Sequence, residues 1–359
     1  MALLRAPGIG PARFARLLEH FGSAAAALAA DRAEWARLGL PDTALDYLRH
    51  PDWRQVERDL AWLERPGNHL LQLDDARYPP LLRQIAYPPP LLFVHGDPDC
   101  LRAPQLAIVG TRNPTPPGRE TAHRFAAHLA EGGLVITSGL ALGIDAAAHQ
   151  GALTGGRTVA VMGTSLDQVY PARHRDLAYA IAERGALVSE LPIGTPALAE
   201  NFPRRNRLIS GLALGVLVVE AALQSGSLIT ARLALDQGRE VFAIPGSIHN
   251  PLAKGCHALI RQGAKLVETA NDILEELGSL AAAGAGEPAT LASATATPDA
   301  LDDDYRRLLA ALGDEPAGVD LLVERCGLTA EVVSSMLLIL ELEGYVAAVP
   351  GGLYCRLKP

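Results

Sequence analysis

Short apolar runs alternate with longer amphipathic stretches through the middle of the chain. Each run is rich in aliphatic and β-branched residues and has the length of a buried strand, while the stretches between the runs favour helices. The predicted strands are 91–94, 106–109, 134–137, 158–162, 186–189, 216–219, 240–244 and 265–267. Strands that alternate with helices predict a doubly wound, mostly parallel α/β sheet, here over residues 70–277.

The pattern of residues 1–65 predicts a small helical domain. A Gly-x-Gly turn at residues 8–10 precedes a helix with apolar Phe14, Leu17, Leu18 and Phe21. This arrangement resembles a helix-hairpin-helix or SAM-like unit, in which the N–H groups of the turn hold a backbone phosphate. The region contains nine arginines and nine acidic residues, so it has no basic excess. Contact with DNA and a plain helical packing module therefore both remain open.

The C-terminal part has a different texture. Residues 278–304 are rich in Ala, Gly, Thr and Pro and are expected to form a flexible linker. Beyond it, helix-turn-helix and hairpin patterns predict a winged-helix domain over 305–359. Its expected helices are 305–312, 319–326 and 329–343, and its strands are 345–349 and 353–357. Five basic residues against seven acidic ones favour a protein-contact or regulatory role over DNA reading there.

Composition narrows the class of protein. The 359 residues are 49% hydrophobic and include no apolar stretch of about 20 residues, so we expect a globular, cytoplasmic protein without a membrane span or signal peptide. The four cysteines are far apart and lack a Cys-x-x-Cys pair, which disfavours a disulfide framework and a zinc site. The net charge of −8 requires that any contact with nucleic acid come from local basic clusters.

The turn after the predicted strand 134–137 is the first candidate for ligand binding. Ser138 and Gly139 lead into an Ala-rich helix that ends near Gly151. The N–H groups of such a turn lie at the positive end of a helix, and Gly139 and Gly143 would let an anion approach closely. The alternative is a tight glycine turn that serves only packing.

Other strand ends carry similar small or basic residues. Gly110-Thr111-Arg112 follows strand 106–109, and Gly163 follows strand 158–162. Because ligands of doubly wound sheets bind outside the carboxyl ends of the strands, these residues predict a pocket for phosphate.

Two helix starts support the same prediction. Phe202 precedes Arg204, Arg205 and Asn206, so that arginines able to grip phosphate stand beside a ring able to stack on a base. Pro203 in the first turn predicts that this cluster faces outward. The second start, Ser225-Gly226-Ser227, can hold a phosphate or simply cap its helix.

Signatures of nucleotide enzymes are missing. The sequence has neither a G-x-G-x-x-G fingerprint with its distant acid nor a P-loop. The titratable candidates are Asp145, His149, Glu190 and Glu220. Asp145 and His149 lie at i, i+4 and would share a helix face, but a lone Asp–His pair without a placed nucleophile is usually structural. Asp145 is therefore assigned to bracing the N–H groups of the loop and His149 to packing beneath it. We predict no catalytic residue, no cofactor and no metal site.

The chain resembles the DprA family, also called Smf, closely over roughly residues 70–275. The motifs that carry the resemblance are Gly110-Thr111-Arg112, Ser138–Asp145 with Ala148-His149, Phe202–Arg207, Val219-Glu220-Ala221 with Ser225–Ala231, and Gly238–Gly246. The resemblance implies an extended Rossmann-like domain between a helical N-terminal domain and a C-terminal winged helix. It also implies a DNA pocket lined by Arg112, Ser138, Gly139, Phe202, Arg205 and Asn206.

The same resemblance implies a function without catalysis. The protein would bind single-stranded DNA, protect incoming DNA, dimerise and hand the strand to the recombinase RecA during natural transformation. A phosphate pocket with few aromatics independently predicts sequence-tolerant binding of single strands that weakens as salt rises. The apolar segment 228–235 is a candidate for the dimer face or the RecA contact.

Two alternatives come from other classes. One is a nucleotide-processing enzyme similar to the phosphoribohydrolases, although Pro245-Gly246-Ser247 does not match their Pro-Gly-Gly-x-Gly-Thr loop. The other is a structural adaptor whose glycine turns serve packing alone, which would leave Arg112 and Arg205 without a role.

Overall fold

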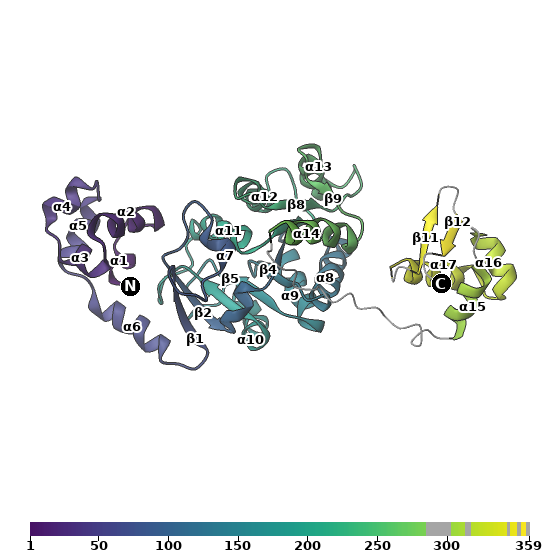
Figure 1. Ribbon diagram of the computed structural model, residues 1–359, viewed down its shortest axis with the longest axis horizontal. Helices are drawn as coiled ribbons and strands as arrows, with labels where there is room; N and C mark the ends of the chain where they lie inside the picture. Colours follow the sequence, from purple (N-terminus) through teal and green to yellow (C-terminus); the bar gives the residue numbers. More distant parts are fainter. Residues whose placement is uncertain (285–302, 313–316, 343–344, 350–352, 357–359) are drawn as a thin grey trace. The chain divides into compact units, whose positions relative to one another are not determined.

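The computed structural model describes residues 1–284, 303–312, 317–342, 345–349 and 353–356. The chain divides into two units, residues 1–289 and 290–359, which are described separately (Figure 1).

The first unit begins with short helices. They are α1 Ala2–Arg5, α2 Pro11–Phe21, α3 Ala24–Ala29, α4 Arg32–Arg37, α5 Asp42–Arg49 and α6 Trp53–Leu63. Phe14, Leu17 and Trp35 are buried in a core of their own, so the apolar face expected at the second of these helices does pack inward. Gly22 ends α2 in the left-handed conformation, with φ of 75°.

A nine-stranded sheet forms the centre of the same unit. Its strands are β1 Asn68–Gln72, β2 Leu91–Gly96, β3 Gln105–Val109, β4 Val135–Ser138, β5 Thr158–Val161, β6 Ala186–Ser189, β7 Gly215–Val218, β8 Glu240–Ala243 and β9 Lys265–Leu266. Their order is β1-β2-β6-β5-β4-β3-β7-β8-β9. Pairing is parallel from β6 to β9, whereas β2 is antiparallel to both β1 and β6. The predicted doubly wound, mostly parallel sheet is confirmed.

The edge strand β1 was not predicted. Its residues, Asn-His-Leu-Leu-Gln, contain no β-branched side chain and bury only Leu71 fully, so they lack the pattern of a central strand. Its register against β2 is set by pairing from Asn68 with His95 to Gln72 with Leu91.

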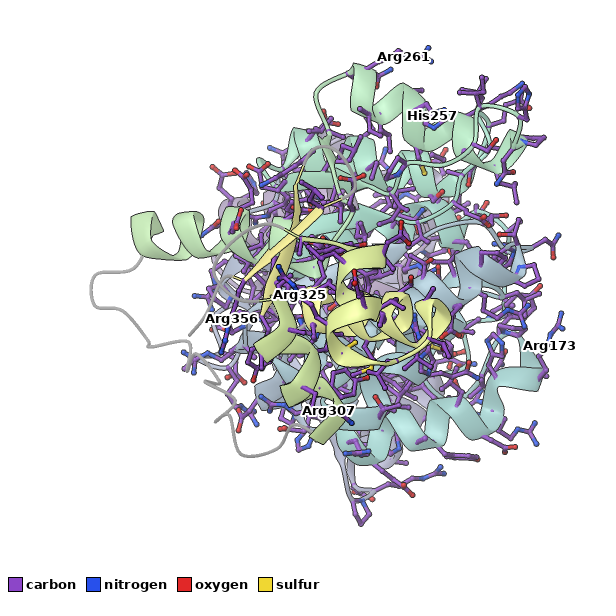
Figure 2. All side chains as sticks on the ribbon, turned by 90° about the vertical axis from the view of Figure 1, so that its right-hand side faces the viewer. Arg173, His257, Arg261, Arg307, Arg325 and Arg356 are labelled. Atoms are coloured by element: carbon purple, nitrogen blue, oxygen red, sulfur yellow. The ribbon has the colours of Figure 1, made fainter. Side chains whose placement is uncertain are left out.

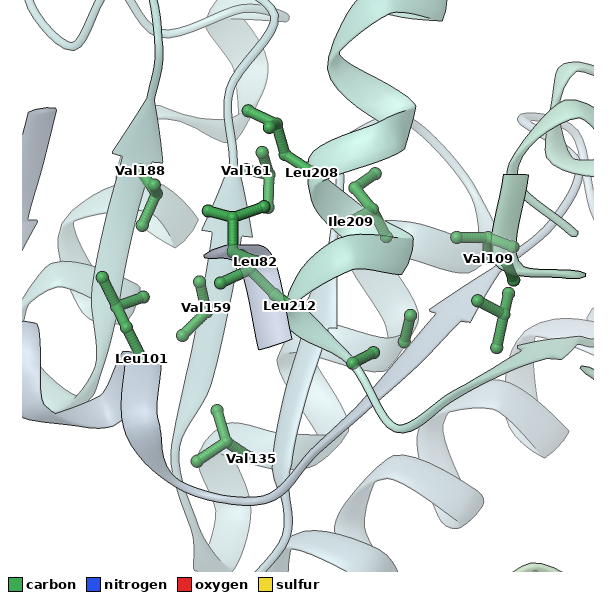
Figure 3. Packing of buried hydrophobic residues seen from close by; sticks show 14 of the residues in the cluster. Leu82, Leu101, Val109, Val135, Val159, Val161, Val188, Leu208, Ile209 and Leu212 are labelled. Atoms are coloured by element: carbon green, nitrogen blue, oxygen red, sulfur yellow. The ribbon is translucent and has the colours of Figure 1, made fainter. Parts of the chain in front are cut away.

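Helices cover both faces of the sheet. They are α7 Pro80–Arg83, α8 Pro116–Glu131, α9 Ile144–Gly155, α10 Arg175–Arg184, α11 Asn201–Leu212, α12 Gly226–Asp236, α13 Lys254–Arg261 and α14 Ala270–Gly284, with 3-10 turns at Pro98–Arg102, Ala172–His174 and Pro251–Ala253. One apolar core joins α7, α11, α12 and α13 to the sheet, and the opposite face packs against α8, α9, α10 and α14. Figure 3 shows Leu208, Ile209 and Leu212 of α11 directed at the strands.

The second unit has the predicted winged-helix elements. They are α15 Asp303–Leu312, β10 Ala317–Gly318, α16 Val319–Cys326, α17 Ala330–Leu342, β11 Val346–Val349 and β12 Leu353–Arg356. The short β10 adds a third strand to the expected hairpin, in the order β10-β12-β11. In the range expected as a linker, α14 continues to Gly284, and residues 285–302 lie outside the described residues.

Two general properties of the described residues bear on function. Within them, no helix combines the length and the apolar character needed to cross a bilayer. Cys100, Cys256 and Cys326 are buried free thiols, and no group of His, Cys, Asp and Glu side chains in this part of the chain has the arrangement of a metal site.

Candidate functional site

A central cavity of about 530 Å³ lies at the carboxyl ends of β3 and β7. The strand order reverses between these two strands, and this is where open α/β sheets bind their ligands. The cavity is walled by the loop after β3, by one side of α11 and by the start of α12. The residues predicted from sequence that line this cavity are Gly110, Thr111, Arg112, Asp145, Phe202, Arg205, Asn206, Ser225, Gly226 and Ser227.

The loop after β3 presents a cation to this central cavity. Arg112 is exposed, and within the described residues no acidic side chain pairs with its guanidinium. The loop itself is anchored, since Thr111 N–H donates to the Glu220 carbonyl at 2.7 Å. Gly110 allows this close packing, because a Cβ there would lie 2.6 Å from the Ile144 side chain. A fixed loop thus carries a free positive charge.

The start of α12 supplies a second anion-binding element. Ser225 caps the helix by accepting from Ser227 N–H at 3.3 Å, and the two hydroxyl groups are 2.7 Å apart. The first turn contains no acidic residue, so the positive end of the helix dipole faces the central cavity without compensation.

An aromatic pair stands at the side of the cavity. The rings of Tyr170 and Phe202 are 5.2 Å apart with an angle of 49° between their planes. Tyr170 is 48% exposed, and sequence reasoning missed it because it lies in an irregular segment without periodicity. Gly163 does not line the cavity. It makes room for the Phe202 ring, which would lie 2.7 Å from a Cβ at that position.

Arg205 corrects the prediction that the arginine cluster faces outward. Its side chain is 6% exposed, and its guanidinium donates to the carbonyl oxygens of Gly139, at 2.7 Å, and Val161. Burial lowers the pKa of Arg205 to about 10, against the raising effect of Asp145. The reason lies in the helix period, since Arg205 shares a face of α11 with Leu208, Ile209 and Leu212.

The turn after β4 shows the predicted bracing by Asp145 but not the expected phosphate cradle. Asp145 accepts from the N–H groups of Gly139, at 3.1 Å, and Ala141, at 3.3 Å, so a carboxylate of the chain occupies the position expected for a phosphate. Burial raises the pKa of Asp145, and the charge of Arg205 opposes this shift. Ser138 is fully buried and donates to the Ile108 carbonyl at 2.6 Å. Ser138 and Gly139 therefore support the cavity from behind and do not line it.

His149 lies deeper still. It is fully buried, and its Nδ1 is 2.7 Å from the Thr158 hydroxyl. Because that hydroxyl donates to the Ile136 carbonyl, the Nδ1–H of His149 must be the donor to it. Burial lowers the pKa of His149 to about 3, so this histidine is neutral at physiological pH.

The two remaining acidic candidates have structural partners. Glu220 accepts from the N–H of Thr115 at 2.9 Å and from its hydroxyl at 2.6 Å, at the start of α8. Glu190 is paired with Arg207, and burial raises its pKa while Arg207 opposes the shift. Arg204, the last predicted residue, is exposed and lines a neighbouring cavity of about 490 Å³.

Three family models match this chain. Residues 69–278 match the model described as DNA recombination-mediator protein A, residues 1–38 a DprA-like N-terminal HHH domain, and residues 292–352 a DprA winged helix domain. Protein Smf of Escherichia coli is 49% identical over 311 residues, which are 85% of this chain and 82% of that protein. DNA processing protein DprA of Streptococcus pneumoniae is 48% identical over 205 residues, or 57% of this chain and 72% of the other.

Two solved structures are also similar. The X-ray structure of DprA from Streptococcus pneumoniae has a TM-score of 0.68 and 37% identity, and covers 76% of this chain and 95% of that one. The structure of DNA processing protein A from Helicobacter pylori, reported for its single-stranded DNA binding mode, has a TM-score of 0.54 and 31% identity. That match covers 59% of this chain and 96% of the other.

Proposed function

The chain belongs to the DNA recombination-mediator protein A (DprA) family, and from this premise we propose that it binds single-stranded DNA in the central cavity. The observation that carries the proposal is the meeting of three elements there: the unpaired Arg112, the uncompensated start of α12 and the Tyr170–Phe202 pair. The first two suit backbone phosphates, and the aromatic pair suits stacked bases.

This combination favours binding that tolerates any sequence. Stacking and phosphate contacts do not depend on the hydrogen-bonding edges of the bases, so we expect single strands of different sequence to bind similarly. Affinity falls as salt rises, because each phosphate contact releases counterions. Duplex DNA binds more weakly, since its bases are not free to stack on Phe202.

We propose no catalytic step. The acidic candidates are engaged in holding the fold: Asp145 with loop N–H groups, Glu220 with Thr115 and Glu190 with Arg207. No observation favours the nucleotide-processing alternative over strand binding.

The proposed partners follow from the family. The protein would act in the cytoplasm during natural transformation as a homodimer, protect the incoming strand and load RecA on it. Ile229 and Leu235 of α12 are 44% and 52% exposed, which supports this helix as a candidate contact surface for the second copy or for RecA. Contact with a second copy would present two DNA pockets and raise affinity through multivalency.

Fluorescence anisotropy tests the strand-binding proposal. A labelled dT strand of about 20 nucleotides, long enough for a typical single-strand site, is titrated with the wild-type chain and Arg112→Ala. Arg261→Ala is the matched control. Arg261, labelled in Figure 2, is exposed at the C-terminal end of α13, just before the edge strand β9, and does not line the central cavity.

We expect Arg112→Ala to weaken binding about tenfold, roughly 1.4 kcal/mol. The salt slope, which is the slope of the logarithm of the binding constant against the logarithm of the salt concentration, should become shallower by about 0.7, the value for one phosphate contact on a single strand. The control should bind like the wild type. Equal binding by Arg112→Ala and the wild type would remove the central cavity as the DNA site, and turnover of nucleotides would then become the next assay.

A further inference from the structure

The second cavity, of about 490 Å³, lies between the N-terminal helices and the α/β sheet. One wall is the segment 4–11, with its Gly-x-Gly turn. The other is formed by residues 190–198 and the first turn of α11. The strand-binding proposal uses neither this cavity nor the N-terminal turn.

The walls of the second cavity are fixed by a buried ion pair. Arg5 donates to both carboxylate oxygens of Asp59, at 2.7 and 2.6 Å, and to the Ile193 carbonyl at 2.8 Å. Asp59 is fully buried and also accepts from Ile193 N–H at 3.0 Å. These bonds join α1, α6 and the loop after β6, so the second cavity is part of the folded unit.

Buried donors without partners line this cavity. Asn201 is 5% exposed and Arg205 is 6% exposed, and within the described residues Asn201 Nδ2 and Arg205 Nε have no hydrogen-bond partner. Because an unpaired buried donor is costly, these groups point to a ligand with acceptor oxygens. Arg204 adds an exposed guanidinium that no acidic side chain in this part of the chain pairs.

The opposite wall is also suited to an anion. Gly10 is the N-cap of α2, an eleven-residue helix without a side-chain cap or an acidic residue in its first turn. A Cβ on Gly10 would lie 3.8 Å from Arg204 Nη2, so the positive helix end and the guanidinium are close together. The carboxylate in this cavity, Glu190, forms its ion pair with Arg207 and also lies within the electrostatic reach of Arg204.

We propose that the second cavity binds a backbone phosphate of the same single strand that occupies the central cavity. Arg205 lines both cavities, so the two lie next to each other and a strand bound in the first would have the second within reach. The N-terminal turn and Arg204 then act as a second phosphate clamp. The inference rests on the proposed function, and it assigns DNA contact to the N-terminal domain.

Strand length separates the two sites experimentally. Anisotropy is measured with dT strands of about 6 and about 20 nucleotides, the first near the lower end and the second beyond the upper end of the roughly 4–16-nucleotide site sizes of OB folds. The proteins are the wild type, Arg204→Ala, Arg112→Ala and the Arg261→Ala control. Arg204 is exposed, so its removal should leave thermal unfolding unchanged. A parallel titration with thymidine monophosphate distinguishes a continuing strand from a free nucleotide.

We expect Arg204→Ala to weaken the long strand about fivefold to tenfold, to leave the short strand within about twofold of the wild type and to lower the long-strand salt slope by about 0.7. Arg112→Ala should weaken both strands. If Arg204→Ala binds the long strand like the control while Arg112→Ala remains weak, the second clamp is refuted and the proposed function stands.

Other outcomes also refute the second clamp. Equal loss on both strands would place Arg204 in the central site. If Arg204→Ala lost binding of thymidine monophosphate but bound both strands like the wild type, the second cavity would be a site for a free nucleotide. A wild-type chain that binds neither strand would overturn both the clamp and the proposed function.

Discussion

Replacing Arg205 with alanine removes the two hydrogen bonds that its guanidinium donates to the carbonyl oxygens of Gly139 and Val161. It also removes the positive charge that faces the buried carboxylate of Asp145. The substitution therefore disturbs the turn after β4 from two sides, and we predict a large loss of folding stability from a residue that sequence alone assigns to DNA.

The magnitude follows from burial. A hydrogen bond to a charged group contributes about 1.5–3 kcal/mol, so the two bonds donated by Arg205 together give about 3–6 kcal/mol. Because Arg205 borders two open cavities, water can enter the space it leaves, which favours the lower end of this range. We expect the free energy of unfolding to fall by about 3 kcal/mol, or the melting temperature by roughly 6–12 °C for a domain of this size.

The pH dependence gives the prediction a second readout. Burial already raises the pKa of Asp145, and loss of Arg205 removes the charge that opposes this shift. The folded variant then holds the Asp145 proton to a higher pH than the unfolded chain, so its stability declines as pH rises from about 4 through the folded pKa. The loss of unfolding free energy in Arg205→Ala relative to the wild type should therefore be largest near neutral pH and become smaller toward pH 4.

Urea unfolding of the wild type, Arg205→Ala and Arg205→Ala with Asp145→Asn at several pH values measures these effects. The double variant should regain part of the stability at neutral pH, since it no longer buries an uncompensated carboxylate. A single variant within about 0.5 kcal/mol of the wild type, the range of ordinary surface substitutions, would refute the bracing role of Arg205.

Three further predictions concern other contacts. Tyr170→Ala should weaken dT binding in anisotropy by about 1–3 kcal/mol, the value of one stacked base, and unchanged affinity would exclude this ring from the site. Asp59→Ala should lower unfolding stability in urea by about 3–5 kcal/mol, because Arg5 loses its buried partner. The comparison is Glu120→Ala, which breaks the exposed ion pair of Glu120 with Arg124; an effect of Asp59→Ala smaller than that would contradict the prediction. Glu220→Ala should cost about 1–3 kcal/mol in the same assay, since two donors lose their acceptor, and an unchanged midpoint would mean that water replaces the carboxylate.

The sheet was predictable because its central strands are continuous apolar runs. Strands such as β3 and β7 are buried on both faces, so each can be recognised as a continuous apolar run from its own sequence, without knowledge of the strands that pair with it. β1 carries no such signal, because it is an edge strand whose place depends on pairing with β2. The carboxyl-end rule correctly brought the loop after β3 and the start of α12 to one cavity.

The roles of individual arginines were harder to predict. Pro203 in the first turn of α11 was the basis for predicting that the cluster faces outward. The spacing of Asn201, Arg205 and Leu212 places all three on the buried face of α11. This helical periodicity is the feature of the sequence from which the burial of Arg205 could have been predicted. The sequence around Arg205 does not identify the carbonyl groups of Gly139 and Val161 as its partners, since they come from the turn after β4 and from β5.

The carboxylate of Asp145 has a consequence for the speed and entropy of ligand capture. The turn after β4 is held in its final shape by an acceptor from its own helix, whether or not a ligand is present. The entropy of ordering that turn is therefore lost during folding and not again when a ligand arrives. Under the proposed function, a strand that enters the central cavity meets an ordered wall, and its association rate is set by encounter and electrostatic attraction to Arg112 and not by the ordering of this turn.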